Sequence, residues 1–255
     1  MVKLTKFTDR SREAGFTLVE LAVVMIIIGL LIGGVLKGQE LIANAQVAAT
    51  VAQVKGIDAA TTTFRDMFSS LPGDMANGNA RLPNCPAGTC GPATVAGVTG
   101  NGRVDSPFNA APSAEGIAFW WQLNAADLLS GIDPQRGTVF GGNYPVAKIG
   151  GGLHTGFVAG GALAGLPAVM GATPPNNIRA GHYLLLHSQA NTAATAASVA
   201  LLTPNQAFRI DSKLDDGVPM SGSVLAAGQA ACINGTVYNE SVAAANCGLY
   251  MRFQN

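Results

Sequence analysis

The chain has 255 residues and no formal net charge at pH 7, and only 12% of its residues are charged, about half the share in an average soluble domain. This length allows one medium-sized domain in addition to an N-terminal segment. The balanced charge does not predict a nucleic-acid partner, because phosphate contacts require clustered Lys and Arg. With 48% hydrophobic residues, the composition also excludes general disorder.

The N-terminus combines a short charged segment with a long apolar run. Residues 1–15 carry four basic and two acidic side chains, and residues 16–36 are apolar except for Thr17 and Glu20. As a helix, residues 16–36 would be about 30 Å long, which matches the core of a bilayer. Positive charge before the first apolar run keeps the N-terminus in the cytoplasm, so the rest of the chain is expected to cross the membrane.

Glu20 is the costly residue of this run. An ionisable group in hydrocarbon costs at least ~2.5 kcal/mol at depth, so a carboxylate retained there usually has a partner. We expect no partner for Glu20 within reach in the sequence. The alternative interpretation is an ordinary membrane anchor or signal peptide in which Glu20 lies at the interface.

Residues 15–20, with the leader before them and the apolar run after them, resemble the prepilin signature of type IV pilins and type II secretion pseudopilins. In that family, a prepilin peptidase cuts after the glycine and methylates the new N-terminal residue. The resemblance implies cleavage between Gly15 and Phe16, N-methylation of Phe16, and a role for Glu20 in filament assembly. Residues 71–74 and 210–222 are also similar to segments of prepilin-type proteins.

The resemblance implies an α+β fold, in which a long N-terminal helix packs on an antiparallel-sheet head with long loops. Small residues and valines recur at helical spacing along residues 37–68, which indicates an amphipathic helix, and Pro72 ends it. The expected organisation is a removed leader (1–15), a transmembrane and filament-core helix (16–36), its amphipathic continuation (37–70) and a globular head (71–255).

Short regular elements are predicted between the loops of the head. Residues 73–112 are rich in Gly, Pro, Asn and Ala and indicate an irregular loop, and residues 137–177 indicate glycine-rich strands and turns. The predicted elements are a helix over 113–130, a buried strand over 181–187, a helix from the capping box at 203–206 to residue 214, and closing strands over 224–227, 237–239 and 249–253.

Four cysteines are present, at Cys85, Cys90, Cys232 and Cys247. An even number in a chain that is expected to cross a membrane indicates disulfides. Of the three connectivities, the two local pairs Cys85–Cys90 and Cys232–Cys247 are expected. The chain has no Cys-x-x-Cys pattern, so these cysteines do not predict a redox or zinc site.

Asp211, Asp215 and Asp216 are weak candidates for a calcium site, because calcium prefers clustered carboxylate oxygens. The alternative is that the three aspartates cap a helix and stabilise a turn. No complete set of ligands is evident, and no metal or cofactor is predicted.

Catalytic motifs are not evident. His154, His182 and His187 stand apart in the sequence, and His182 and His187 are expected to point to opposite faces of one strand. The glycine-rich residues 149–156 lack the Gly-Lys-Ser/Thr ending of a phosphate-binding loop. The sequence therefore predicts a protein that is not an enzyme.

The resemblance implies a structural subunit of a type IV pilus-like filament, polymerised through its N-terminal helix. The implied partners are other subunits of the filament, the prepilin peptidase, the inner-membrane assembly machinery and, before assembly, the inner membrane of a bacterium. The head is expected in the periplasm and then in an extracellular or periplasm-spanning filament. The alternatives are a pseudopilin of a type II secretion system and a minor subunit for adhesion at a filament tip.

Overall fold

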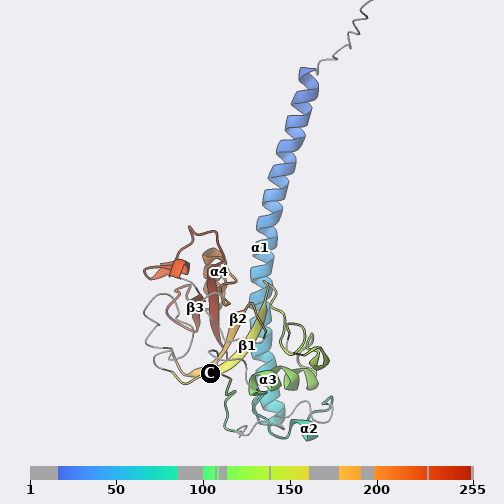
Figure 1. The fold of residues 1–255 in the computed structure, drawn as a ribbon, viewed down its shortest axis with the longest axis vertical. Helices are drawn as coiled ribbons and strands as arrows, with labels where there is room; N and C mark the ends of the chain where they lie inside the picture. Colours follow the sequence, from blue (N-terminus) through green and yellow to red (C-terminus); the bar gives the residue numbers. More distant parts are fainter. Residues whose placement is uncertain are drawn as a thin grey trace, which may run out of the picture. The chain divides into compact units, whose positions relative to one another are not determined.

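The computed structural model describes residues 17–85, 100–106, 108, 114–137, 139–160, 178–190, 198–228 and 230–253 (Figure 1). The chain divides into two compact units, Met1–Asn44 and Ala45–Asn255. The boundary between them falls inside the first helix, α1 (Leu18–Phe68), which has 51 residues. The fold class is α+β, as predicted.

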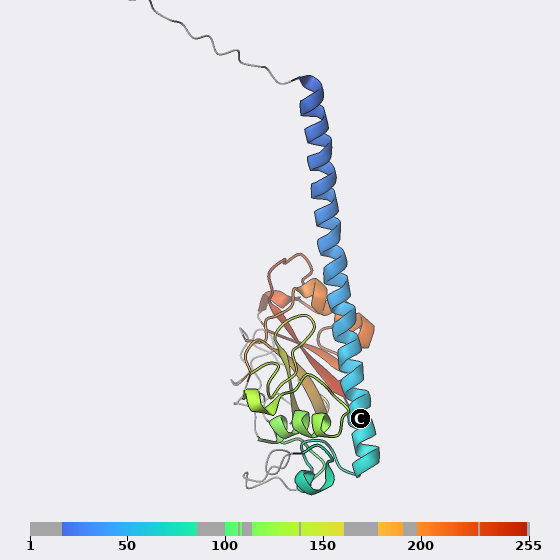
Figure 2. The same ribbon diagram turned by 90° about the vertical axis from the view of Figure 1, so that its right-hand side faces the viewer.

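In the second unit, one face of α1 is buried. The side chains on this face recur every three or four residues, which is the spacing of one helical stripe. They are Val47, Thr50, Val51, Val54, Ile57, Ala60, Thr61 and Phe64. The apolar members belong to the same hydrophobic core as the strands, and Figure 2 shows this part of α1 running alongside the sheet.

The sheet of the head has four antiparallel strands in the order β1-β2-β6-β3. Its strands are β1 (Gly152–Val158), β2 (Gly181–His187), β3 (Val224–Gly228) and β6 (Cys247–Phe253). A separate hairpin joins β4 (Ile233–Asn234) to β5 (Val237–Tyr238). Every residue of β2 is buried, as expected for a strand between two others. The C-terminal strand β6 is also internal, so the last described residues complete the core.

The helices and short turns of the head are α2 (Gly78–Arg81), α3 (Ala114–Ala125), η1 (Pro134–Arg136), α4 (Pro204–Leu214) and η2 (Ala230–Cys232). The capping box that the sequence predicts for α4 is present. The Gln206 amide donates to Thr203 Oγ1 (3.2 Å), and the Thr203 amide donates to Gln206 Oε1 (3.0 Å). This reciprocal pair satisfies two donors at the start of the helix.

Two sequence expectations need correction. The helix predicted to reach residue 130 ends at Ala125, because Asp127 adopts a positive φ of 59°, which does not continue a right-handed helix. The predicted loop over residues 73–112 contains the short helix α2. A single turn of four residues has too little periodicity to be evident from sequence.

Residues 71–74 connect the end of α1 to α3. The Gly73 amide donates to Gln122 Oε1 (2.6 Å), and Gly73 has a φ of +87° with the Glu115 carbonyl 2.7 Å from where a Cβ would lie. Buried Asp74 accepts from the amides of Asn101 (3.1 Å) and Gly102 (2.7 Å). This segment therefore holds three parts of the head together.

Candidate functional site

Thr17 and Glu20 form a reciprocal cap at the start of α1. The Glu20 amide donates to Thr17 Oγ1 (3.3 Å), and Glu20 Oε2 accepts from the Thr17 amide (2.9 Å) and hydroxyl (2.8 Å). The expectation that Glu20 has no partner within reach is therefore wrong. The Thr-x-x-Glu spacing is the sequence signal for this cap. Gly15 and Phe16, the predicted processing residues, lie outside the described residues.

The helix that follows this cap has apolar side chains exposed on all sides. α1 is long and apolar enough to cross a membrane, by length and composition. The exposed large side chains of this part are Leu18, Val19, Leu21, Val23, Val24, Met25, Ile26, Ile27, Ile28, Leu30, Leu31, Ile32, Val35 and Leu36. Exposed apolar patches far smaller than this mark interaction surfaces in soluble proteins. The segment therefore requires lipid or other protein chains around it.

Cys232 and Cys247 form a disulfide with their Cα atoms 5.1 Å apart. Cys232 is the last residue of η2, Cys247 is the first of β6, and both are fully buried. Cys85 is also disulfide-bonded. Its predicted partner, Cys90, lies outside the described residues, so the Cys85–Cys90 pair stays a prediction.

The structure brings the three candidate aspartates together. One carboxylate oxygen of each of Asp211, Asp215 and Asp216 lies within 4.8 Å of the others. Each carboxylate also accepts hydrogen bonds. Asp211 accepts from the Tyr238 hydroxyl (2.7 Å), Asp215 from the amides of residues 223 and 224, and Asp216 from the amide two residues further on (2.8 Å). These bonds tie α4 to β3 and β5.

The surroundings of this cluster favour the turn interpretation. Burial raises the pKa of Asp211 to about 7, against the lowering effect of the Tyr238 hydrogen bond. Gly222 has a φ of +78°, and a Cβ there would lie 1.6 Å from Asp215 Oδ2, so only glycine fits beside that carboxylate. A calcium ion would have to share oxygens that already hold the turn.

The three histidines do not all stand apart. The rings of His154 and His187 stack with centroids 4.7 Å apart and an interplanar angle of 11°. His187 Nδ1 accepts from the Gln189 amide (3.0 Å), and its Nε2 bonds Ser198 Oγ (3.0 Å). Burial lowers the pKa of His154 to about 3, with a further lowering from His187. The pair is neutral core structure, whereas His182 contacts Phe157 and Phe253.

Within the described ranges, the three aspartates are the one group of at least three His, Cys, Asp or Glu residues close enough to hold a metal ion. No nucleophile with a neighbouring base was predicted from the sequence. The structure places the Ser198 hydroxyl beside His187, and both of these residues are buried.

Residues 10–36 match the model of a prokaryotic N-terminal methylation motif. The matched segment contains the predicted processing residues Gly15 and Phe16, together with Glu20 and the apolar part of α1. No curated protein and no solved structure matches the chain. The matched motif therefore covers the N-terminal segment of the chain.

Proposed function

We propose, from the type IV pilin and pseudopilin signature at residues 10–36, that the chain is a structural subunit of a type IV pilus-like filament. Its precursor is held in the membrane by the apolar part of α1. A prepilin peptidase then cuts between Gly15 and Phe16 and methylates Phe16. The processed subunits polymerise through α1. The observation that carries this proposal is the methylation motif at residues 10–36, which includes the start of α1. The described residues of this matched part, 17–36, are all exposed.

The exposed apolar helix supports polymerisation on physical grounds. Burial of apolar surface contributes about 25 cal/mol per Å², and residues 18–36 are all exposed. A bilayer covers this surface before assembly. Equivalent helices of neighbouring subunits cover it in a filament, where packing of helix against helix replaces lipid.

Glu20 has a specific part in this assembly. In the single chain its carboxylate accepts hydrogen bonds from the amide and the hydroxyl of Thr17, and both of these donors are neutral. Cleavage creates a charged amine at Phe16. A staggered neighbour can present that amine to Glu20 in the dry core, and a charge-assisted hydrogen bond is stronger than the neutral one it replaces. The pair sets the register between subunits, because any other stagger buries a lone charge.

The proposed localisation follows from the same motif and from the leader. The precursor lies in the inner membrane with the head in the periplasm, since positive residues before the apolar run favour the cytoplasm. Assembly machinery of the inner membrane then adds the subunit to an extracellular or periplasm-spanning filament. A disulfide between Cys232 and Cys247 suits an oxidising compartment outside the cytoplasm.

A pseudopilin of a type II secretion system has the same signature and is the alternative. A deletion strain separates the two roles. Loss of surface filaments by electron microscopy, with normal export of secreted proteins, supports the pilus subunit. Normal filaments with periplasmic accumulation of those secreted proteins support the pseudopilin. Unchanged filaments and unchanged export would contradict both.

A further inference from the structure

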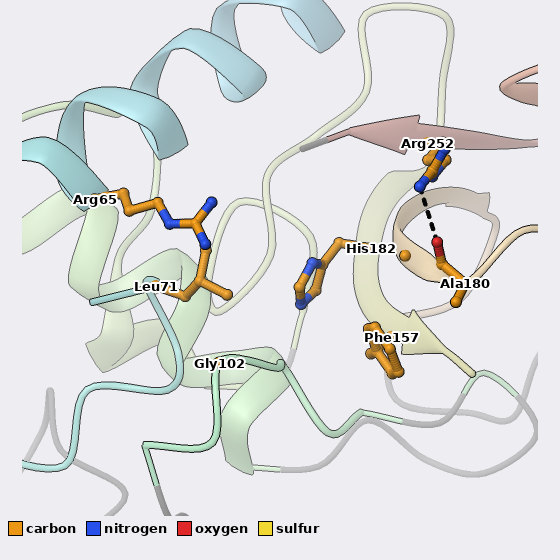
Figure 3. A pocket seen from close by; sticks show the side chains of 8 residues that line it. Arg65, Leu71, Gly102, Phe157, Ala180, His182 and Arg252 are labelled. Atoms are coloured by element: carbon orange, nitrogen blue, oxygen red, sulfur yellow. Dashed lines mark hydrogen bonds between the residues drawn. The ribbon is translucent and has the colours of Figure 1, made fainter. Parts of the chain in front are cut away.

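A cavity of about 200 Å³ lies beside the end of α1 in the head. It is smaller than a pocket for a drug-sized ligand. Its walls come from α1, β1, β2, β6 and the loops that follow α1 and precede β2 (Figure 3). The described residues that line it are Arg65, Leu71, Gly102, Phe157, Ala180, Gly181, His182 and Arg252. Two guanidinium groups and one imidazole are thus present, and none of the described lining residues is acidic.

Arg252 is held in place by the backbone before β2. Its Nη2 donates to the Ala180 carbonyl (2.9 Å). Its Nε is buried and has no hydrogen-bond partner among the described residues. The guanidinium packs against Gly181, where a Cβ would lie 2.6 Å from Nε. The arginine is therefore positioned before any ligand arrives, and part of its donor capacity is unused.

His182 adds a neutral donor to the same cavity. Its Nε2 accepts from the Val104 amide (3.2 Å), so the proton of the neutral ring is on Nδ1. Burial and, to a smaller extent, the nearby Arg65 lower the pKa of His182 to about 4, against a raising effect of Asp105. The ring is fixed by edge contact with Phe157, at 5.2 Å between centroids. Near neutral pH it offers an N–H group and no charge.

The charge distribution gives this cavity a preference for anions. Arg65 and Arg252 both also line an adjoining cavity of about 410 Å³, whose lining includes Asp58 and Asp66. Acidic side chains are therefore gathered on that side of the arginines. None of the described residues that line the cavity on the His182 side is acidic. The Asp105 carboxylate lies close enough to raise the pKa of His182, but its effect is smaller than the opposite effect of Arg65.

We propose that the cavity beside His182 binds a small oxyanion, a phosphate or carboxylate group, through Arg65, Arg252 and His182. Planar guanidinium forks match the oxygen spacing of both groups. The cavity volume admits such a group either free or as the end of a larger molecule. This site is independent of the apolar part of α1, so it goes beyond the role in the filament.

The test is a titration of the full-length chain in detergent, labelled with ¹⁵N at histidine. Inorganic phosphate and acetate are the two probes, each added at constant ionic strength. We expect the ring signals of His182 to shift and saturate with a dissociation constant of about 1 mM or below. The signals of His154 and His187 stay in place and report that the head is folded.

Three variants make the test specific. Arg252→Gln and Arg65→Gln are each expected to weaken binding by at least about tenfold. Arg136→Gln is the matched control, because Arg136 is exposed in η1 and is not among the described lining residues. It should change the dissociation constant by less than about twofold. If Arg252→Gln disturbs the signals of His154 and His187, Arg65→Gln carries the test.

Each outcome decides the proposal. Saturation by either probe supports it, and the tighter probe identifies the ligand group as phosphate or carboxylate. Absence of any saturable shift of the His182 signals with both probes would overturn it. An equal loss of affinity in Arg136→Gln would also overturn it, since the effect would then be that of general surface charge.

Discussion

Substitutions can separate the observed cap of Glu20 from the role in assembly that we propose for it. Glu20→Leu removes both the cap with Thr17 and the charge, whereas Glu20→Gln keeps an acceptor for the cap and removes only the charge. We expect both variants to insert into the membrane and to be processed, and both to lower the yield of sheared filaments by at least about tenfold, because the amine of a neighbour is left buried alone. Glu20→Asp should be intermediate, since its arm is shorter.

Filament yield in Glu20→Gln is the informative measurement. Membrane-held and sheared subunit are compared by immunoblot in the same cells. Normal yield from Glu20→Gln, with a loss in Glu20→Leu, would assign Glu20 to the helix cap alone and refute the pairing between subunits. Normal filament yield from both variants would support the alternative interpretation, in which Glu20 lies at the membrane interface and has no part in assembly.

The raised pKa of Asp211 predicts that the stability of the head falls as the pH rises. Its pKa is raised from 3.8 to about 7, chiefly by burial. The folded chain therefore binds more protons than the unfolded chain between these values, and stability falls as pH rises through that window. Asp211→Asn does not titrate. The free energy of unfolding of the wild type minus that of Asp211→Asn should fall from pH 4 to pH 7 and level off above it.

Urea unfolding of the full-length chain in detergent, followed by tryptophan fluorescence, measures this difference. Asp216→Asn is the matched control for loss of a charge at an exposed position of the same turn. A difference that rises with pH would contradict the account. The same assay tests calcium binding, and we expect added calcium not to change the free energy of unfolding at pH 7. An increase in this free energy that is lost in Asp211→Asn would support a calcium site.

At the scale of the element, α4 depends on its cap. Thr203 and Gln206 exchange two hydrogen bonds at the start of this helix, and α4 anchors the three aspartates. Thr203→Ala should lower the free energy of unfolding by about 1 kcal/mol. Thr203→Ser keeps the hydroxyl and should stay close to the wild type. Equal stability of Thr203→Ala and the wild type in urea unfolding would show that the cap contributes nothing.

The disulfide between η2 and β6 is the second device at this scale. It closes a separation of 15 residues, which stabilises by about 3 kcal/mol on the chain-entropy model. The double variant Cys232→Ser and Cys247→Ser should lose about that amount in urea unfolding. Non-reducing peptide mapping of the wild type should recover the linked pairs Cys232–Cys247 and Cys85–Cys90. Free thiols or crossed pairs would contradict the assignment.

Elements with strong local signals could be located from the sequence. For residues 137–177 strands and turns were expected without bounds, and β1 shows why the bounds could not be predicted. The apolar runs of β2 and β6 and the capping box of α4 all gave correct elements. β1 comes from a glycine-rich run, and pairing with β2 over all seven of its residues makes it a strand. At Gly156, a Cβ would lie 2.1 Å from the Ser106 carbonyl. That close approach is tertiary and leaves no periodic pattern.

The candidate sites divide in the same way. The cap of Glu20 is local and has a sequence signal in the Thr-x-x-Glu spacing, but the expectation from the sequence was that Glu20 has no partner. The cavity beside His182 joins Arg65 from α1 to Arg252 from β6, and no spacing in the sequence brings these two residues together. The stacked pair of His154 and His187 is likewise set by the register of β1 against β2.

At the scale of the whole molecule, the chain combines a folded head with an exposed apolar segment. All described residues from Thr17 to Leu36 are exposed, whereas the head has its own core of buried strands and helices. A monomer in water would carry this exposed surface at a large cost in free energy. The head can therefore be surrounded by water, whereas the apolar segment requires lipid or other helices. A membrane-held precursor that later joins a filament would provide these surroundings.

The most direct test of this account is the N-terminal peptide of the chain in filaments sheared from the cell surface. Mass spectrometry of the sheared fraction should identify a peptide that begins at N-methylated Phe16 and still contains Glu20. The uncleaved leader, residues 1–15, should be confined to the membrane fraction. A mature chain that begins after Leu36, or a chain absent from every filament preparation, would contradict the account, because the helix proposed for assembly would then be missing or unused.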